Sequence, residues 1–442
     1  MQENRIRRRN FAALTLEGAF FVIGTAFIDV NAVIPVFIFT YMHSLKLAGL
    51  AATINLAASI VAQTLIGPYV RSIRRMPFYI TLLMFIFRPL TLLMIPVLFS
   101  GLSDAWNVAV FLFLYSLLFF GDGLVVVAWT DLLGRTILPE NRGKVFGYQQ
   151  LLGGIGALAA GFLIKYLLEN QTLTNDQRYA IIFSGAAVSL LVSAVAMSFS
   201  RDLPRIPATR PARNWHYYAQ FPACLRRHPE FRRVAVIRIL SGIAAMIAPL
   251  MILYGQGIFG LDAAQISTLV YIQIIGGLVG GLFWSQISSR LGNKAVIRAA
   301  QVTGLAIPAY ALVCLLFRQT DQAWYLLWPL ILVNGMYMGS WVGFLNYTID
   351  IVEEEERTVY LLLSNLITFP LSILSFLAGI FADWIGFLPL FGVSGLAALA
   401  GIFLSRRLQS PCDLPPETAG VRPGCPADPA SVHPPRHGSD PD

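Results

Sequence analysis

Twelve stretches of about 20 mostly apolar residues follow one another along this 442-residue chain, which is more than a soluble core could bury. Charged residues make up 13% of the chain, whereas soluble proteins carry about 25%, so a water-exposed surface cannot be covered. Each stretch is long enough to cross a bilayer, and backbone that faces lipid must be helical to satisfy its own polar groups. The sequence therefore predicts an all-α membrane protein with twelve transmembrane helices.

The chain divides into two bundles of six helices. We expect an N-terminal bundle at 1–198, a linker at 199–233, a C-terminal bundle at 234–405 and a tail at 406–442. The second part of the linker mixes aromatic and cationic residues, which suits a helix lying on an anionic membrane surface; a plain solvated linker is the alternative. The tail carries nine prolines from Pro411 onward and is expected to be disordered. The predicted spans are 14–40, 47–67, 77–99, 107–130, 145–167, 179–198, 234–258, 265–288, 296–317, 324–349, 359–382 and 387–405.

The positive charges predict the orientation. Segments on the side of the N-terminus hold 24 Lys and Arg residues, and the opposite loops hold four, namely Lys46, Lys165, Arg178 and Arg318. Loops rich in Lys and Arg stay in the cytoplasm. We therefore expect a multi-pass protein of the bacterial inner membrane with both termini cytoplasmic, and we attribute the net charge of +8 to orientation rather than to nucleic-acid binding.

The two halves repeat weakly. The run PENRGKVFGYQQLLG, which enters the fifth span, matches EEERTVYLLLSNLIT, which enters the eleventh, and the match pairs Arg142 with Arg357. The loop after the eighth span holds Arg290 and Lys294, and the loop after the second holds Arg71 and Arg75 at a similar offset. Two parallel halves of six helices are a common plan of transporters.

These residues resemble the major facilitator superfamily over about residues 10–405. The family's loop Gly-x-x-x-Asp-Arg-x-Gly-Arg-Arg is present in degraded form: Gly67 and Arg75 remain in the first copy, and Arg290, Gly292 and Lys294 in the second. The stretches AFIDVNAVIPVF and VAWTDLLGRTILPENRGKVFG also resemble a bacterial branch of unassigned permeases. The resemblance implies the 6+6 fold and a gate built from loops on the cytoplasmic side. The gate residues it implies are Arg71, Arg75, Arg142, Arg290, Lys294 and Arg357.

Motifs for other chemistry are missing from the sequence. The chain contains no Gly-x-x-x-x-Gly-Lys-Ser/Thr run that would bind ATP, and no Ser-His-Asp or Cys-His set is visible. Its four cysteines are too scattered for a disulfide framework or a Cys-x-x-Cys metal site. We expect no enzyme activity, no cofactor and no metal.

Three charged residues are predicted at membrane depth. They are Asp29 in the first helix, Arg88 in the third and Asp122 in the fourth. A charge at the bilayer centre costs about 2.5–3.5 kcal/mol even on the insertion scale, so each needs a partner or a function. Burial disfavours the charged form of a carboxylate, so such an acid can load and release a proton near neutral pH.

The three charges allow several arrangements. For Asp29 we expect a proton or substrate role, with a pair to Arg88 or a helix cap as the alternatives. For Asp122 we expect a buried ion pair with Arg88, with a place in the proton pathway as the second role. The family resemblance implies that the first and fourth helices line the central cavity, which favours Asp29 and Asp122.

Other polar residues allow two interpretations. Glu17 lies near the start of the first predicted span, where we expect an interfacial residue that balances the charge of Arg7 to Arg9; membership of a proton relay with Asp29 is the alternative. Asn346 and Asp350 share a face at the end of the tenth span and could contact substrate or cap the following loop. Several uncharged polar side chains are expected to form interhelical hydrogen bonds, namely Gln63, Gln150, Gln273, Asn334 and Asn365.

The sequence favours a secondary transporter that moves a small organic solute by alternating access, most simply driven by protons, as a monomer in the lipid bilayer. A uniporter would have a similar sequence. A receptor or assembly factor on a transporter scaffold is the alternative from another class, and it could fill the space between the halves with apolar side chains. A neutral, amphipathic or cationic solute is favoured over a strongly anionic one, because few charges line the presumed cavity.

Overall fold

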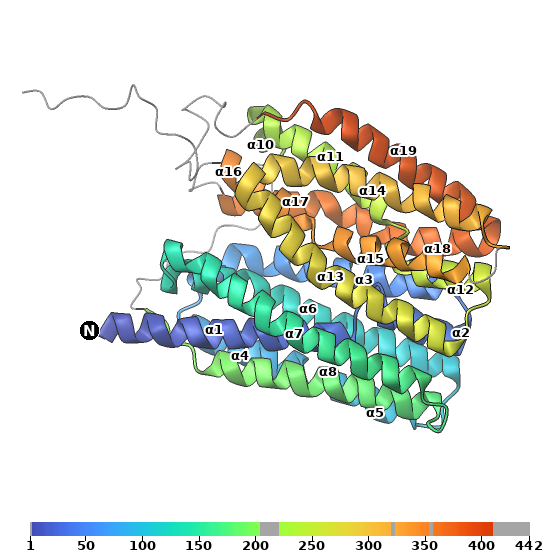
Figure 1. The fold of residues 1–442 in the computed structure, drawn as a ribbon. Coiled ribbons are helices and arrows are strands. Elements are labelled where there is room, and N and C mark those ends of the chain that lie inside the picture. Colours follow the sequence, from blue (N-terminus) through green and yellow to red (C-terminus); the bar gives the residue numbers. More distant parts are fainter. Residues whose placement is uncertain (1, 204–220, 320–322, 353–356, 410–442) are drawn as a thin grey trace, which may run out of the picture.

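The predicted twelve-helix architecture is confirmed. A computed structural model of the chain describes residues 2–203, 221–319, 323–352 and 357–409. Within these ranges every regular element is a helix, and twelve helical spans are long and apolar enough to cross a membrane. The helices run roughly parallel in two bundles, one from each half of the chain (Figure 1).

The N-terminal bundle contains spans one to six. Its third span is interrupted at Pro89, which has no backbone N–H for the helical ladder, and Arg88 lies at this junction. Two other spans of this bundle are built from more than one element, and the remaining three are single long helices. The elements are α1 (Gln2–Phe27), α2 (Val33–Met42), α3 (Leu45–Ile66), η1 (Gly67–Ser72), α4 (Met76–Phe87), α5 (Leu90–Leu98), α6 (Asp104–Thr136), α7 (Pro139–Glu169) and α8 (Asn175–Ser198).

The C-terminal bundle contains spans seven to twelve. Its seventh and eleventh spans pass through short 3₁₀ turns that begin next to Pro249 and Pro370, and its tenth span breaks at Gly339 and Ser340. The elements are α10 (Phe221–Arg227), α11 (Pro229–Ala245), η2 (Ala248–Leu250), α12 (Met251–Phe259), α13 (Ala263–Leu291), α14 (Asn293–Leu316), η3 (Ala323–Leu326), α15 (Leu327–Met338), α16 (Trp341–Ile351), α17 (Arg357–Thr368), η4 (Phe369–Ile373), α18 (Leu374–Ile385) and α19 (Phe387–Ser405).

Most boundaries lie within a few residues of the sequence-based expectation; larger differences include the end of the fourth span at Thr136, the break of the first span after Phe27, and the starts of the first and seventh spans. The first helix begins at Gln2 instead of near residue 14, so the arginine-rich start of the chain continues the first span as helix. The seventh span begins at Pro229, because a proline fits the first turn of a helix, and it takes up the end of the expected linker. Phe221 in α10 is buried against the C-terminal bundle with Phe231 and Tyr360. Residues 204–220 and the tail from 410 lie outside the described residues.

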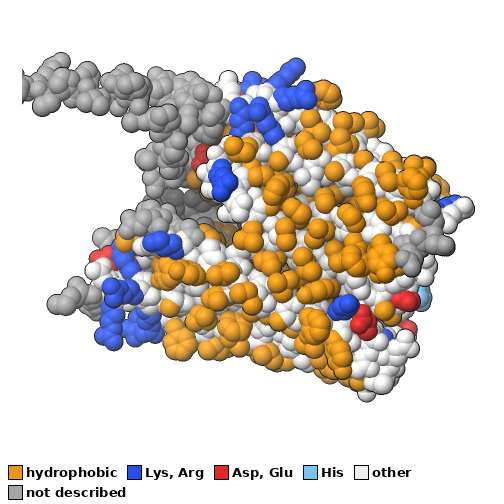
Figure 2. Space-filling model, in the orientation of Figure 1, with side chains coloured by type: hydrophobic (Ala, Val, Ile, Leu, Met, Phe, Trp, Pro, Cys, Tyr) orange, Lys and Arg blue, Asp and Glu red, His pale blue; other side chains and the backbone are white. Residues whose placement is uncertain are grey.

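The surface divides into an apolar belt and a basic end. Large apolar side chains such as Phe113 and Phe162 are exposed. Apolar side chains cover much of the visible face of the bundles, where lipid would contact them (Figure 2). Exposed arginines gather at the end that carries the N-terminus, including Arg74, Arg75 and Arg290. We call this end the basic side and the opposite end the far side. The pattern is that of a multi-pass membrane protein.

Candidate functional site

A cavity of about 290 Å³ lies between the two bundles. The N-terminal half lines it with α1, the segment after α1, α3, α6 and α7, and the C-terminal half lines it with α13 and α15. Most of its wall is apolar, with a few polar side chains that point inward, as is usual for small-molecule sites. The polar lining residues among those described are Thr25, Asp29, Asn31, Asn55, Gln150 and Gln273.

Asp29 lies where the first span loses its helical form. The α1 helix ends at Phe27 and α2 begins at Val33, so the backbone between them is unwound. The Asp29 carboxylate accepts a hydrogen bond from the backbone N–H of Asn31 (2.9 Å), and its carbonyl accepts one from Ile34 (3.0 Å). Irregular backbone at membrane depth is tolerated only inside the protein or along a cavity. The break therefore turns this stretch of chain toward the space between the bundles.

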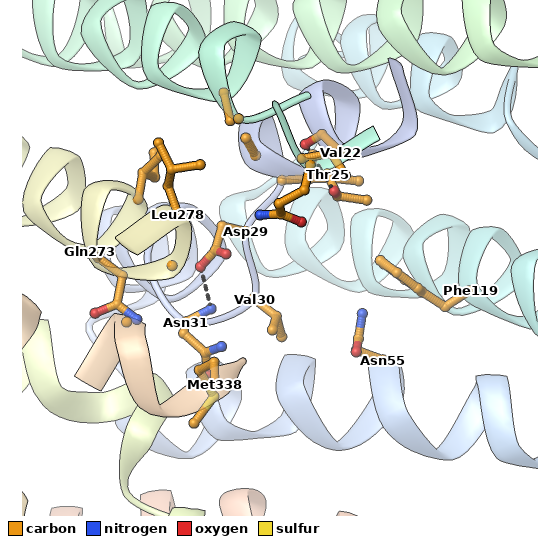
Figure 3. Close-up of a pocket in the computed structure, with 18 residues that line it drawn as sticks. Val22, Thr25, Asp29, Val30, Asn31, Asn55, Phe119, Gln273, Leu278 and Met338 are labelled. Carbon is orange, nitrogen blue, oxygen red and sulfur yellow. Dashed lines mark hydrogen bonds between the residues drawn. The ribbon is translucent and has the colours of Figure 1, made fainter. Parts of the chain in front are cut away.

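Asp29 is the one charged side chain among the described residues that line the cavity. It is partly exposed to the cavity, and no Lys or Arg in the described ranges forms an ion pair with it. Its carboxylate lies near the middle of the lining, between Asn31 and the Gln273 and Leu278 side chains of α13, with Phe119 and Asn55 across the space (Figure 3). The site thus offers one uncompensated carboxylate surrounded by neutral groups.

Amide side chains supply the other polar contacts. Gln273 is buried on α13 and lies 3.3 Å from the Asn334 amide of α15. Asn334 also donates to the carbonyl of Ala248 (3.1 Å), in the broken part of the seventh span. Breaks thus occur at matching positions of the two halves, in spans one and seven, which is a recurring feature of transporter binding sites. The seventh span itself supplies no lining residue among those described. Its Ala248 carbonyl contacts Asn334, which is next to the lining residue Gly335 on α15.

A second polar group lies inside the N-terminal bundle, away from the cavity wall. The Arg88 guanidinium, 2% exposed, donates from Nη2 to Glu17 Oε1 (3.1 Å) and from Nη1 to Ser193 Oγ (2.6 Å). Ser193 in turn donates to the Glu17 carbonyl (2.6 Å). Asp122 lies farther away, with 3.8 Å between its Oδ1 and Arg88 Nε. The predicted partner, Asp122, is therefore near Arg88, but Glu17 holds the hydrogen-bonded position.

The expectation that Glu17 lies at the membrane interface is wrong. Glu17 is 4% exposed, and its carboxylate is bound by Arg88 and Ser193. The reason is the length of α1: because this helix starts at Gln2, Glu17 is about four turns from its end. The sequence did carry a signal: apolar residues flank Glu17 on both sides, so a search for charges at membrane depth could have included this residue.

The halves are held together on the far side. The Thr53 hydroxyl of α3 donates to the Ser372 carbonyl (2.6 Å), and the Lys46 N–H donates to Asp383 (3.3 Å). Ser267 at the start of α13 donates to Glu169 at the end of α7 (3.0 Å). The outer segments α2 and α12 also contact each other. These contacts join the two halves at the end away from the basic side.

Comparison with known proteins identifies the family. The family model described as Major Facilitator Superfamily matches residues 18–375, which is more than half of the chain. The chain belongs to the Major Facilitator Superfamily.

Solved structures of similar shape share little sequence with this superfamily member. The crystal structure of a D-xylose–proton symporter has a TM-score of 0.68 at 14% identity and covers 92% of this chain and 99% of that chain. A bacterial homologue of the iron transporter ferroportin, in the inward-facing state, has a TM-score of 0.64 at 14% identity and covers 91% and 98%. At these identities the likeness shows the fold.

Curated relatives match only in part. Uncharacterized proteins of Mycobacterium tuberculosis and Mycobacterium bovis are each 26% identical to this superfamily member over 213 residues, which is 47% of this chain. The match spans about two fifths of the length of these relatives, 39%.

The residues expected from the superfamily's loops lie on the basic side. Arg75 and Arg290 are exposed and Lys294 is partly buried. The side chains of Arg71, Arg142 and Arg357 lie outside the described residues. An acidic partner that the sequence analysis did not single out, Asp202, binds Arg135 at 2.8 Å just after α8.

Asn346 is partly buried on α16 and is not among the residues that line the cavity. Its neighbour Asp350 accepts a hydrogen bond from Asn293 at the start of α14 (2.7 Å). The structure thus places this pair near a helix junction of the superfamily fold, and not with Asp29.

Proposed function

We propose that this member of the Major Facilitator Superfamily is a secondary transporter that moves a small organic solute by alternating access and couples the movement to protons. The observation that carries the proposal is the uncompensated Asp29 carboxylate in a polar cavity between the two halves. A cavity with inward-pointing amides favours a transporter over a receptor scaffold, which needs no polar space there.

The cavity favours a small neutral or cationic solute. Its volume of about 290 Å³ is near the lower end of small-molecule sites, which range from about 300 to 1,000 Å³. Asn31, Asn55, Gln150 and Gln273 offer both donors and acceptors, which suits hydroxyl or amide groups. A strongly anionic solute would meet Asp29 with no cation beside it. The likeness in fold to a D-xylose–proton symporter is compatible with a polyhydroxylated solute moving with a proton.

Asp29 would couple the proton to the solute. When the cavity is closed to water, a charged carboxylate in it is costly, and a proton or a cationic solute removes that cost. Release of the proton on the other side restores the charge and completes the cycle.

The remaining expectations belong to the same proposal. The 24-to-4 distribution of Lys and Arg favours an inner-membrane protein with the basic side in the cytoplasm. The gate residues on the basic side would open and close the path between the cavity and the cytoplasm. Asp122 and Asn346 would act outside the cavity wall, and the protein would work as a monomer.

A cavity-filling variant tests the site. Gly277 lines the cavity, and a Cβ added to it meets no side chain or neighbouring helix within 4 Å, so Gly277→Val starts from open space and extends its two methyl groups into the cavity region. Gly392→Val on α19 has the same open surroundings away from the cavity and is the matched control. Purified wild type would be screened with a panel of sugars, polyols, amines and amino acids for solutes that raise its thermal unfolding temperature.

We expect stabilising solutes to be neutral or cationic, to lose their effect on Gly277→Val, and to keep it on Gly392→Val. Stabilisation that survives in Gly277→Val would place the solute elsewhere and refute the assignment of this cavity.

A further inference from the structure

The buried group around Arg88 has an unbalanced charge. Two carboxylates, Glu17 and Asp122, face a single guanidinium, with side-chain exposures of 6%, 15% and 2%. If both acids are ionised, the group carries a net charge of −1 inside a helical bundle. Burial of an uncompensated charge is costly, and an acid can escape it by binding a proton, whereas Arg cannot change its charge. The group is neutral when it holds one proton.

The hydrogen-bond geometry favours Glu17 as the ionised acid. Glu17 Oε1 accepts a hydrogen bond from Arg88 Nη2 (3.1 Å) and also lies 3.2 Å from Ser193 Oγ, whose one hydroxyl hydrogen is shared with the Glu17 carbonyl (2.6 Å). Asp122 accepts no hydrogen bond in the described part of the chain. Arg88 Nε lies 3.8 Å from Asp122 Oδ1 and has no hydrogen-bond partner among the described residues. An ionised carboxylate so close to a free N–H would draw it into a hydrogen bond.

Asp122 is the member of the group that lies nearest a cavity-lining residue along its helix. It lies one helical turn from Phe119 on α6, and residues three apart share a helix face. Phe119 lines the cavity between the bundles, and Asp122 is the most exposed member of the group. We infer that Asp122 exchanges its proton past Phe119, on the cavity side of α6, whereas Arg88 and Glu17 are enclosed.

We propose that Asp122 is a second proton-binding site of this protein, distinct from Asp29. Arg88 lies between the ionised Glu17 and the protonated Asp122. In the proton-loaded form Arg88 binds Glu17 and Ser193, as the structure has it. When the proton leaves Asp122 for the cavity, the new carboxylate accepts the free Nε–H of Arg88, and the contact shortens from 3.8 Å to hydrogen-bond length.

This movement would couple the proton to the bundle. Arg88 lies at the junction of α4 and α5, next to Pro89, where the third span is interrupted. The partners come from α1, α6 and α8, so a shift of Arg88 changes how four spans of the N-terminal bundle are held. The charged groups that act on Asp122 are Arg88 and Glu17. The neighbouring residue Gly123 packs against uncharged residues of α3, Ser59 and Ala62.

Infrared spectroscopy of the full-length protein in lipid nanodiscs tests the proposal, because a protonated carboxyl and a carboxylate absorb at different frequencies. At neutral pH we expect the wild type to show a protonated-carboxyl band that shifts in D₂O. Asp122→Asn should remove one component of it. Asp131→Asn, an acid on the same helix that is paired with Arg135, is the matched control and should remove none.

Glu17→Gln should also remove the Asp122 component, because one remaining acid and one Arg are neutral without a proton. Asp122→Asn should unfold at the wild-type temperature, since Asn has the shape of a neutral Asp. A band unchanged in Asp122→Asn would overturn the proposal. So would a loss of folding in Asp122→Asn, because it would show that the charged form is needed.

The result is separable from the role of Asp29. The Asp122 component should persist in Asp29→Asn, whatever that variant does to transport. A protonated-carboxyl band that disappears only in Asp29→Asn would overturn the Asp122 assignment and leave the proposed function standing.

Discussion

Removing Arg88 should strand a buried carboxylate, and removing that carboxylate as well should recover most of the loss. In Arg88→Ala, Glu17 keeps only the Ser193 hydroxyl as a partner at 6% side-chain exposure. Breaking a buried pair in this way costs about 3–5 kcal/mol. In Arg88→Ala/Glu17→Gln no charge is stranded, and what remains is the lost packing, including the contact of the guanidinium with the Phe21 ring at 5.2 Å, worth about 0.5–2 kcal/mol.

A double-mutant cycle measures this difference. We expect a coupling of about 2 kcal/mol between Arg88 and Glu17, within the range for residues of one network. Between Arg88 and Asp122, tested as Arg88→Ala/Asp122→Asn, we expect about 0.5 kcal/mol or less, because the two make no hydrogen bond. The free energy of unfolding would be obtained from reversible titration with sodium dodecyl sulfate.

Recovery by Asp122→Asn and not by Glu17→Gln would refute this reasoning. It would make Asp122 the charged partner of Arg88, as the sequence alone suggests, and would also exclude a proton on Asp122.

Two further predictions concern the interface between the halves and the topology. Gly49→Ala should destabilise the protein by about 1–3 kcal/mol, because the added Cβ would lie 2.1 Å from the Ser375 carbonyl and force α3 and α18 apart; Gly392→Ala, with open surroundings, should have no effect, and equal unfolding temperatures of the two would contradict the packing. In a variant without native cysteines, Arg318→Cys should react with an impermeant thiol reagent in intact cells, whereas Arg74→Cys should react only after permeabilisation; the reverse result would invert the orientation.

Much of the fold could be predicted from the sequence because the bilayer imposes a simple rule. Twenty apolar residues must be a helix, so the twelve spans follow from composition alone. The breaks within spans were less visible. Pro89, Pro249 and Pro370 mark three of them, but the unwound segment after Phe27 contains neither proline nor glycine, and its form depends on the Asp29 carboxylate and backbone hydrogen bonds.

The site could be predicted only in part. Asp29 and Arg88 were found because a charge in an apolar stretch is conspicuous. Glu17 was assigned to the interface because helix ends are hard to locate in an arginine-rich start. Asn31 and Asn55 line the cavity, but neutral amides in helices carry no signal that separates a cavity wall from a helix contact, as the Gln63–Asn365 hydrogen bond between the halves illustrates. That distinction depends on how the two bundles meet.

The most direct test of the account is solute accumulation by Asp29→Asn in proteoliposomes with an imposed pH gradient, using a solute found by the stabilisation screen. Asn keeps the size of the side chain and an acceptor for the Asn31 N–H, but it cannot bind and release a proton. We predict that wild type and the Asp131→Asn control accumulate the solute against its gradient, and that Asp29→Asn only equilibrates it. Accumulation by Asp29→Asn with the pH dependence of the wild type would contradict the central claim.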